Sequence, residues 1–240
     1  MNIVLLGKHG YRKWLDRASR VTNSTTTMTF TNPSSTLLFE ILLCAQTTGD
    51  KISVWWGDGT YNDYTLNNIV GADAVVGHTY ATAANRTIVL CGADRVRRLV
   101  SIQSDGRSSF GGNITTWTSL TYLSVFGSNT LSGSVAALTS LTYLNVGGSN
   151  TLSGFDGVAV SATKLAYLKM NNALDVATVN GILAGFWANR DVAKTRAERV
   201  IDLNDNVLSA APTGQGLIDK AALQAYVSPP GATVWTVSTN

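Results

Sequence analysis

The sequence predicts a mainly β fold with an α/β repeat part, in which a β-sandwich is followed by a short repeat solenoid with a helical C-terminal cap. The first reason is composition: 14% of the 240 residues are charged and 45% are hydrophobic, so charges are scarcer than in most soluble proteins. The second reason is a series of short apolar runs, separated by turn residues, over residues 22–93. The third is an internal repeat over residues 94–210.

Charge and hydropathy limit the function classes. A net charge of +3 is too small to favour sequence-independent binding of nucleic acid. The longest apolar stretch, residues 37–45, is far shorter than the roughly 20 residues that cross a bilayer, so we expect no membrane insertion. The apolar run at residues 3–6 is too short for a secretory signal, and no basic segment precedes it. We expect three parts, at residues 1–21, 22–93 and 94–240.

The N-terminal part combines basic and aromatic side chains. Its sequence YRKWLDRASR predicts two to three helical turns, with Trp14 and Leu15 on one side. Two interpretations stay open. One is a terminal strand and short helix packed on the first domain, and the other is an anchor that fastens the protein to a larger, acidic partner. The candidate anchor residues are Tyr11, Arg12, Lys13, Trp14 and Arg17.

Residues 22–93 are predicted to be all β. TTTMTFT and TYNDYTL alternate between apolar and polar residues, as half-buried strands do, whereas TLLFEILLC is mostly apolar, as an inner strand is. KISVWW runs into Gly57-Asp58-Gly59, which is a strong turn signal. VVGHTYA and RTIVLCG supply two more strands. Short strands at this spacing are typical of a sandwich.

This part resembles the PKD-like (polycystic kidney disease) domain, an immunoglobulin-type β-sandwich. The resemblance rests on WGDGT at residues 56–60, HTY at residues 78–80 and the strand RTIVL that follows. The glycines of the turn permit positive φ, and Asp58 is expected to hydrogen-bond the backbone of the turn. Tyr80 is expected at the edge of the core, with its hydroxyl at the rim. The resemblance implies a structural or binding module.

The two cysteines, Cys44 and Cys91, lie in apolar, strand-like runs. Without a nearby group of histidines they predict no zinc site. Two interpretations stay open: two buried thiols in adjacent β-layers, or a disulfide across the sandwich. A reactive thiol would need an activating neighbour that the sequence does not supply.

The clearest signal in the chain is the internal repeat. SLTYLSVFGSNTLSG begins at Ser119, and SLTYLNVGGSNTLSG begins 21 residues later at Ser140. KLAYLKMNN is a further copy, and RLVSIQSDG and RVIDLNDNVL are weaker ones, with Leu99 as the expected counterpart of Leu120. A period of this length with this apolar spacing resembles the leucine-rich repeat. The resemblance implies that the leucines of neighbouring copies share one core beneath a parallel sheet.

Two helices and a last strand are expected to cap the repeat. Residues 174–190 predict a helix with Asp175 as its N-cap. Residues 213–216 lead into a second helix, and ATVWTVSTN predicts the final strand. The order of these segments resembles a C-terminal module of leucine-rich-repeat proteins from Bacteroidetes bacteria and their phages. The apolar positions of the first helix are Val176, Val179, Ile182, Leu183 and Phe186.

Few residues predict chemistry. The two histidines are His9 and His78, and Asp58 is expected to approach His78 across the sandwich. No G-x-S-x-G elbow accompanies this pair, the aspartates lack calcium-loop spacing, and no phosphate-binding glycine loop is present. We therefore expect no enzyme activity, no catalytic residue, no metal and no cofactor.

One face of the repeat is a candidate binding face. Tyr122, Tyr143 and Tyr167 take the same position in three successive copies and are expected to stack as a ladder. Tyrosines beside small polar residues suit contacts with protein or sugar. The alternative is that the stack only stabilises the sheet. The candidate face consists of Tyr122, Ser124, Phe126, Tyr143, Asn145, Tyr167, Lys169 and Asn171.

The whole pattern predicts a non-enzymatic structural protein of a phage virion, as a capsid decoration, a head fibre, or a tail or fibre component. It would stabilise the particle or attach it to a host-surface glycan or protein. We expect homo-oligomers in many copies, which turn weak contacts into avidity. The N-terminal segment is expected to contact other virion proteins. The alternatives are a bacterial cell-surface or extracellular adhesin and a carbohydrate-binding accessory module.

Overall fold

The chain folds mainly as β-structure, as the sequence predicts. The computed structural model describes residues 3–32, 37–101, 111–125, 130–147, 151–153, 165–171, 174–188, 190, 199–203, 211–226 and 235–239, without the side chains of residues 3–9, 151 and 171. The helices are α1 (Ile3–Thr22), α3 (Val176–Ala188) and α4 (Gln215–Ala225), with the 3-10 turns η1 (Ala93–Arg95), η2 (Ile114–Thr116) and η3 (Val135–Ala137).

The strands of residues 22–93 match the predicted apolar runs. They are β1 (Thr27–Asn32), β2 (Leu38–Ala45), β3 (Lys51–Trp55), β4 (Tyr61–Thr65), β5 (Ala74–Thr79) and β6 (Arg86–Cys91). The strands that follow are β7 (Val96–Ser101), β8 (Gly111–Asn113), β9 (Tyr122–Val125), β10 (Thr130–Ser134), β11 (Tyr143–Gly147), β12 (Thr151–Ser153), β13 (Tyr167–Asn171), β14 (Val200–Asp202) and β15 (Thr236–Ser238).

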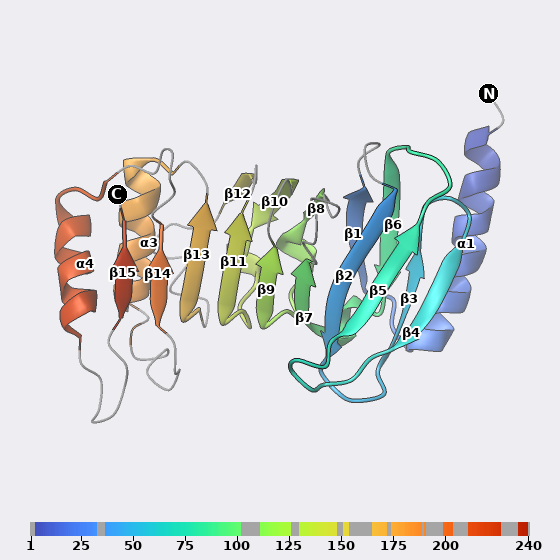
Figure 1. Cartoon of the computed structure of the whole chain (residues 1–240), viewed down its shortest axis with the longest axis horizontal. Coiled ribbons are helices and arrows are strands. Elements are labelled where there is room, and N and C mark those ends of the chain that lie inside the picture. Colours follow the sequence, from blue (N-terminus) through green and yellow to red (C-terminus); the bar gives the residue numbers. More distant parts are fainter. Residues whose placement is uncertain are drawn as a thin grey trace.

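Two sheets run along the long axis of the molecule, with α1 at one end and α4 at the other (Figure 1). Sheet A has the strand order β12-β10-β8-β1-β6-β3-β4, and sheet B has the order β15-β14-β13-β11-β9-β7-β2-β5. From β7 to β15, all neighbouring strands of sheet B are parallel. The strands of residues 22–93 pair antiparallel with one another.

Both sheets continue across the expected boundary near residue 93. In sheet A, β1 pairs with β8 through Thr31 and Gly111. In sheet B, β2 pairs with β7, which places Leu42 opposite Val100. The larger hydrophobic core extends from Met28 to Val237, and a smaller cluster around Trp14 lies between α1 and sheet A. We call residues 22–93 the sandwich part and residues 94–240 the repeat part. The two parts therefore share both sheets and the larger core.

Leucines of the repeat fill this core in register. Leu123 pairs with Leu144, and Leu144 pairs with Leu168, and all three are fully buried. The first copy lies three residues away from its expected alignment, because Leu99 pairs with Leu123 and not with the position of Leu120. This shift also places Arg98 beside Tyr122.

The short strands β8, β10 and β12 were not predicted from the sequence. Their sequences, GGN, TLSGS and TLS, carry too few apolar residues to show a period. Two of them end in capped 3-10 turns, since the Asn113 side chain accepts from the Thr115 amide and Ser134 accepts from the Ala136 amide. These strands continue sheet A behind sheet B, so the repeat part has a second β-layer.

The C-terminal end has the two predicted helices. The Thr178 amide donates to the Asp175 carboxylate at 2.7 Å, which confirms Asp175 as the cap of α3. Four of the five predicted apolar positions of α3 are buried, but Val176 is exposed. Helix α4 packs on α3 and reaches β15, where Lys220 donates to the Thr239 hydroxyl at 2.8 Å.

Both cysteines are buried and neither forms a disulfide. Cys44 lies on β2 in sheet B, and Cys91 lies on β6 in sheet A. The interpretation of two buried thiols in adjacent β-layers therefore holds, and the disulfide does not form.

Candidate functional site

The predicted tyrosine ladder is present on sheet B. Tyr122, Tyr143 and Tyr167 lie in register on β9, β11 and β13. Their ring centroids are 4.1 Å apart at both steps, and the planes differ by 7° and 14°. Parallel strands place equivalent residues directly side by side, so identical aromatic side chains stack across them. We call these three residues the tyrosine row.

Arg98 extends the tyrosine row by one strand. The guanidinium carbon of Arg98 lies 3.8 Å from the centroid of the Tyr122 ring, which is a cation–π contact. Its Nε is 3.0 Å from a carboxylate oxygen of Asp73, which precedes β5. The row is therefore tied to the sandwich part through an ion pair whose carboxylate is almost completely buried. Aligning the repeat copies with Leu99 opposite Leu120 does not place Arg98 beside Tyr122. A shift of three residues in the first copy does.

A second row of outward-facing residues lies two positions further along the same strands. Ser124 and Asn145 belong to it and were predicted as exposed neighbours of the tyrosines, but only 3% and 7% of their surfaces are exposed. Small side chains in the middle of a sheet are covered by their larger neighbours. Asn145 donates at 3.5 Å to the Tyr143 hydroxyl, so it forms a hydrogen bond with the central residue of the tyrosine row. The second row consists of Val75, Leu42, Val100, Ser124, Asn145 and Lys169 in successive strands.

The remaining residues of the candidate face divide into two groups. Lys169 is half-buried and pairs with Asp202 at 2.7 Å. Its hydrogen bond to Asp202 raises the pKa of Lys169. Phe126 lies outside the described residues, and so does the side chain of Asn171.

The central hydroxyl of the row is held in its neutral form. Burial raises the pKa of Tyr143, the hydrogen bond from Asn145 lowers it, and those with Tyr122 and Tyr167 raise it again, so that the net pKa lies above the usual value. A neutral phenol both donates and accepts hydrogen bonds. The Tyr143 hydroxyl at the centre of the row is therefore neutral and can serve as both donor and acceptor.

Most of the candidate anchor residues pack α1 onto sheet A. Trp14 is buried, and its indole donates to the Ser53 hydroxyl at 3.0 Å. The Tyr11 ring contacts Trp14 and Trp55, and Arg17 forms a two-point ion pair with Asp63. Arg12 and Lys13 are exposed. The helix is longer than its predicted two to three turns, because it begins at Ile3.

Asp58 and His78 meet, as expected from the sequence. His78 Nε2 lies 2.7 Å from one Asp58 carboxylate oxygen, and the other accepts from the Thr60 amide and hydroxyl at 3.0 and 2.6 Å. The His78 ring stacks on Trp56 at 5.0 Å. This arrangement holds the turn between β3 and β4 against β5. The Tyr80 hydroxyl is not at the rim as expected, because it donates to the buried Trp56 carbonyl at 2.9 Å.

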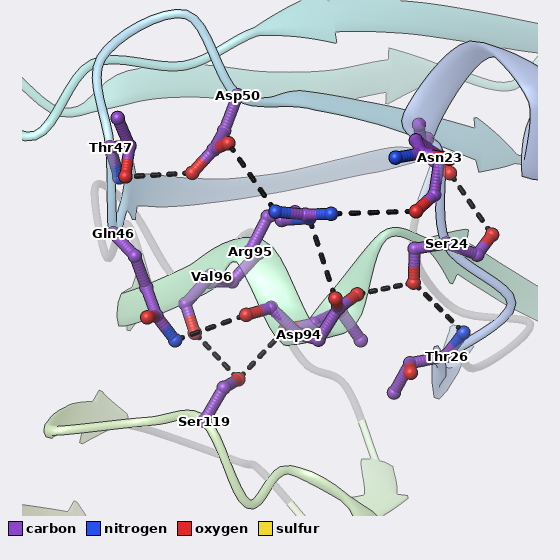
Figure 2. Close-up of polar contacts among 12 residues, drawn as sticks. Asn23, Ser24, Thr26, Gln46, Thr47, Asp50, Asp94, Arg95, Val96 and Ser119 are labelled. Carbon is purple, nitrogen blue, oxygen red and sulfur yellow. Dashed lines mark hydrogen bonds and ion pairs between the residues drawn. The ribbon is translucent and has the colours of Figure 1, made fainter.

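A polar cluster around Arg95 joins several segments at the start of the repeat part (Figure 2). The Arg95 guanidinium lies beside the carboxylates of Asp94 and Asp50, and its charge is therefore balanced within the chain. Ser119, from the repeat part, donates to the carbonyls of Ala93 and Val96 at 2.8 and 2.7 Å. Arg95 Nε is buried without a hydrogen-bond partner, but it lies 3.4 Å from a carboxylate oxygen of Asp94. The contacts of the cluster all lie within the chain and join its segments, so we interpret it as a structural joint.

The described ranges contain no group of three His, Cys, Asp or Glu side chains arranged for a metal ion. Within the same ranges, no helix has both the length and the apolar composition that a membrane span requires. No protein-family model matches the chain, and neither does any curated protein or solved structure. The tyrosine row is therefore interpreted from its own geometry.

Proposed function

We propose that the protein is a non-enzymatic structural and interaction protein of a phage virion, as a capsid decoration or as part of a fibre or tail. The observation that carries the interaction role is the tyrosine row, whose rings are stacked at 4.1 Å before any partner arrives. Side chains that are already ordered lose little conformational entropy on binding. Tyrosine also combines a large apolar ring with a polar hydroxyl, a combination that is common at interfaces.

The virion assignment rests on the resemblance of the sequence to PKD-like and leucine-rich-repeat modules. Both module types serve as display and contact elements, so this step is an analogy at the level of the fold. Helix α1, at the N-terminal end of the molecule, fits an attachment role, because Arg12 and Lys13 are exposed on it. Arrangement in homo-oligomers and in many copies per particle would raise the avidity of a weak contact at the tyrosine row.

Immunogold labelling tests this assignment. An antibody against the chain is applied to purified particles and to cells from a culture of the source. Gold at a fixed position on the particles is the expected result. Gold confined to bacterial envelopes would overturn the virion assignment and favour the surface adhesin. A protein found only in solution, on neither particles nor envelopes, would contradict both assignments.

A further inference from the structure

We propose that the tyrosine row and the second row bind a neutral, linear glycan, with the sugar chain running across the strands of sheet B. The inference rests on the proposed function, because it names the ligand class of the same contact surface. Four features of the face lead to it: covered ring faces, paired charges, an aliphatic flank and a hydroxyl group on each successive strand.

Most ring faces of the tyrosine row are covered within the chain. Tyr143 is stacked between Tyr122 and Tyr167, and the outer face of Tyr122 is covered by the Arg98 guanidinium at 3.8 Å. A ligand above Tyr122 and Tyr143 therefore meets ring edges and phenol hydroxyls, because both faces of these two rings are covered. Such a surface recognises partners that offer many hydrogen-bonding groups along their length, as sugar chains do.

The charges of the face are paired within the chain. Arg98 pairs with Asp73 at 3.0 Å, and Lys169 pairs with Asp202 at 2.7 Å. A strongly acidic or basic partner would find no uncompensated charge in these two pairs, and electrostatic complementarity is what selects such partners. The face therefore favours an uncharged ligand.

The second row adds an aliphatic flank on β5, β2 and β7, the strands of sheet B that continue from the tyrosine strands. Val75 is 55% exposed, and it lies in register with Leu42 and Val100, which are half-buried. Sugar rings carry C–H groups on one side and hydroxyls at the edge. A sugar chain that crosses the strands would therefore meet aliphatic side chains on β5, β2 and β7 and tyrosine hydroxyls on β9, β11 and β13, and its rings carry groups that suit both.

The direction of the chain follows from the sheet. Neighbouring strands lie about 4.8 Å apart, so the tyrosine row presents one hydroxyl per strand at this interval. An extended sugar chain that crosses the strands repeats its hydroxyl groups on a similar length scale. A peptide that adds to a sheet pairs its backbone with an edge strand, whereas the tyrosine row lies in the interior of sheet B. These points favour a glycan over an extended peptide.

The test measures binding of the full chain to an array of linear oligosaccharides. The array holds neutral glucans, mannans, galactans and xylans, together with uronic-acid oligosaccharides of the same lengths. The triple variant Tyr122→Phe, Tyr143→Phe, Tyr167→Phe removes the three hydroxyls and keeps the stacked rings. Tyr61→Phe is the matched control, because Tyr61 is exposed on β4 and its ring contact with Arg17 is retained. Thermal unfolding verifies that both variants fold.

We expect the wild-type chain and Tyr61→Phe to bind at least one neutral oligosaccharide with equal affinity. The triple variant should bind it at least roughly tenfold more weakly or not at all, because it removes three hydroxyls and each lost hydrogen bond weakens binding severalfold. The inference is overturned if no neutral oligosaccharide binds, if only uronic-acid oligosaccharides bind, or if the triple variant binds as well as the wild type.

This test is independent of where the protein resides. Neutral-glycan binding by a chain that immunogold does not find on particles would overturn the virion assignment and leave the ligand class supported. A chain found on particles that binds no neutral glycan would overturn the ligand class alone.

Discussion

Gly57 shows how a single residue fixes the turn between β3 and β4. Its φ is +80°, and a Cβ atom at this position would lie 2.6 Å from the Thr87 carbonyl oxygen. Gly49 also has a positive φ, +96°, but nothing lies within 4 Å of its hypothetical Cβ. The two glycines therefore separate the cost of backbone conformation from the cost of a steric clash.

We predict that Gly49→Ala lowers the free energy of unfolding by about 1 kcal/mol, the usual cost of a left-handed conformation with a side chain. Gly57→Ala should cost clearly more, because the backbone of β6 must also move. Urea unfolding of both variants measures the difference. Equal losses at the two sites would contradict the close packing of the turn against Thr87.

Asp58 makes the stability of the same turn depend on pH. Burial raises the pKa of its carboxyl. Hydrogen bonds from the Thr60 hydroxyl, the Thr60 amide and His78 together lower the pKa by more than burial raises it, so the net pKa is below the usual value. A carboxyl with a lowered pKa in the folded state stabilises the protein above its unfolded pKa of about 3.9. This contribution is lost as the pH falls below that value.

We predict that Asp58→Asn lowers the free energy of unfolding at neutral pH by about 1 kcal/mol, because hydrogen bonds to a charged acceptor are weakened. The difference from the wild type should begin to shrink below about pH 4, where the carboxyl of the unfolded chain takes up a proton, and should vanish only below the lowered pKa of the folded carboxyl. Urea titrations at several pH values measure both effects. Asp16→Asn, on the exposed side of α1, is the control, and a constant difference at all pH values would refute the assignment.

The elements differ in how well the sequence predicts them. Strands β1, β2, β3 and β6 carry strong alternation or apolar runs, and their burial follows from the pattern. Strand β4 was predicted to be half-buried, but only Tyr64 of this strand is partly buried. Strands β8, β10 and β12 have sequences such as GGN and TLS and are held mainly by pairing with their neighbours. The tyrosine row could be predicted from the repeat period. Asp73 and Arg98 could not, because they meet only through the pairing of β2 with β5 and β7.

Helix α1 is part of the folded body, and its removal would expose apolar surface. Trp14 and Ala18 pack against Val89 and Cys91 of sheet A. The sequence left open whether this segment packs or docks elsewhere, because both uses need the same aromatic and basic residues. In the folded chain the aromatic side faces the sheet, and only the opposite side of the helix is available to a partner.

We predict that Trp14→Ala destabilises the protein by about 3–5 kcal/mol, the usual cost of deleting a large buried aromatic side chain. Trp14→Phe should cost less, because it retains most of the packing and loses only the bond to Ser53. Thermal or urea unfolding measures both losses. Lys13→Ala is the exposed control on the same helix, with an expected change within about 0.5 kcal/mol. If Trp14→Ala were as mild as the control, α1 would not be docked on the sheet.

At the scale of the whole molecule, the two sheets and the larger hydrophobic core join the sandwich part to the repeat part. The six tryptophans sample both parts: Trp14, Trp55 and Trp56 lie in the first, and Trp117, Trp187 and Trp235 lie in the second. Elements that share one continuous interior are expected to unfold together. The sequence, with its change of pattern near residue 93, indicates two parts and gives no sign of the shared sheets.

We predict that the chain unfolds in one cooperative transition. Labelling with fluorotryptophan gives one fluorine NMR signal for each tryptophan, and a urea titration follows their native intensities. All six signals should be lost with the same midpoint. Separate midpoints for the two groups of tryptophans would show that the two parts fold independently in spite of the shared sheets.

The central claim is that this one-piece body is a virion component whose tyrosine row faces a partner outside the particle. The most direct measurement is electron cryomicroscopy of particles purified from a culture of the source. We predict density for the chain on the particle surface, with the α1 end toward the particle and the tyrosine row of sheet B open to solvent. The account would be contradicted by particles that lack this chain, or by a tyrosine row buried against neighbouring particle proteins.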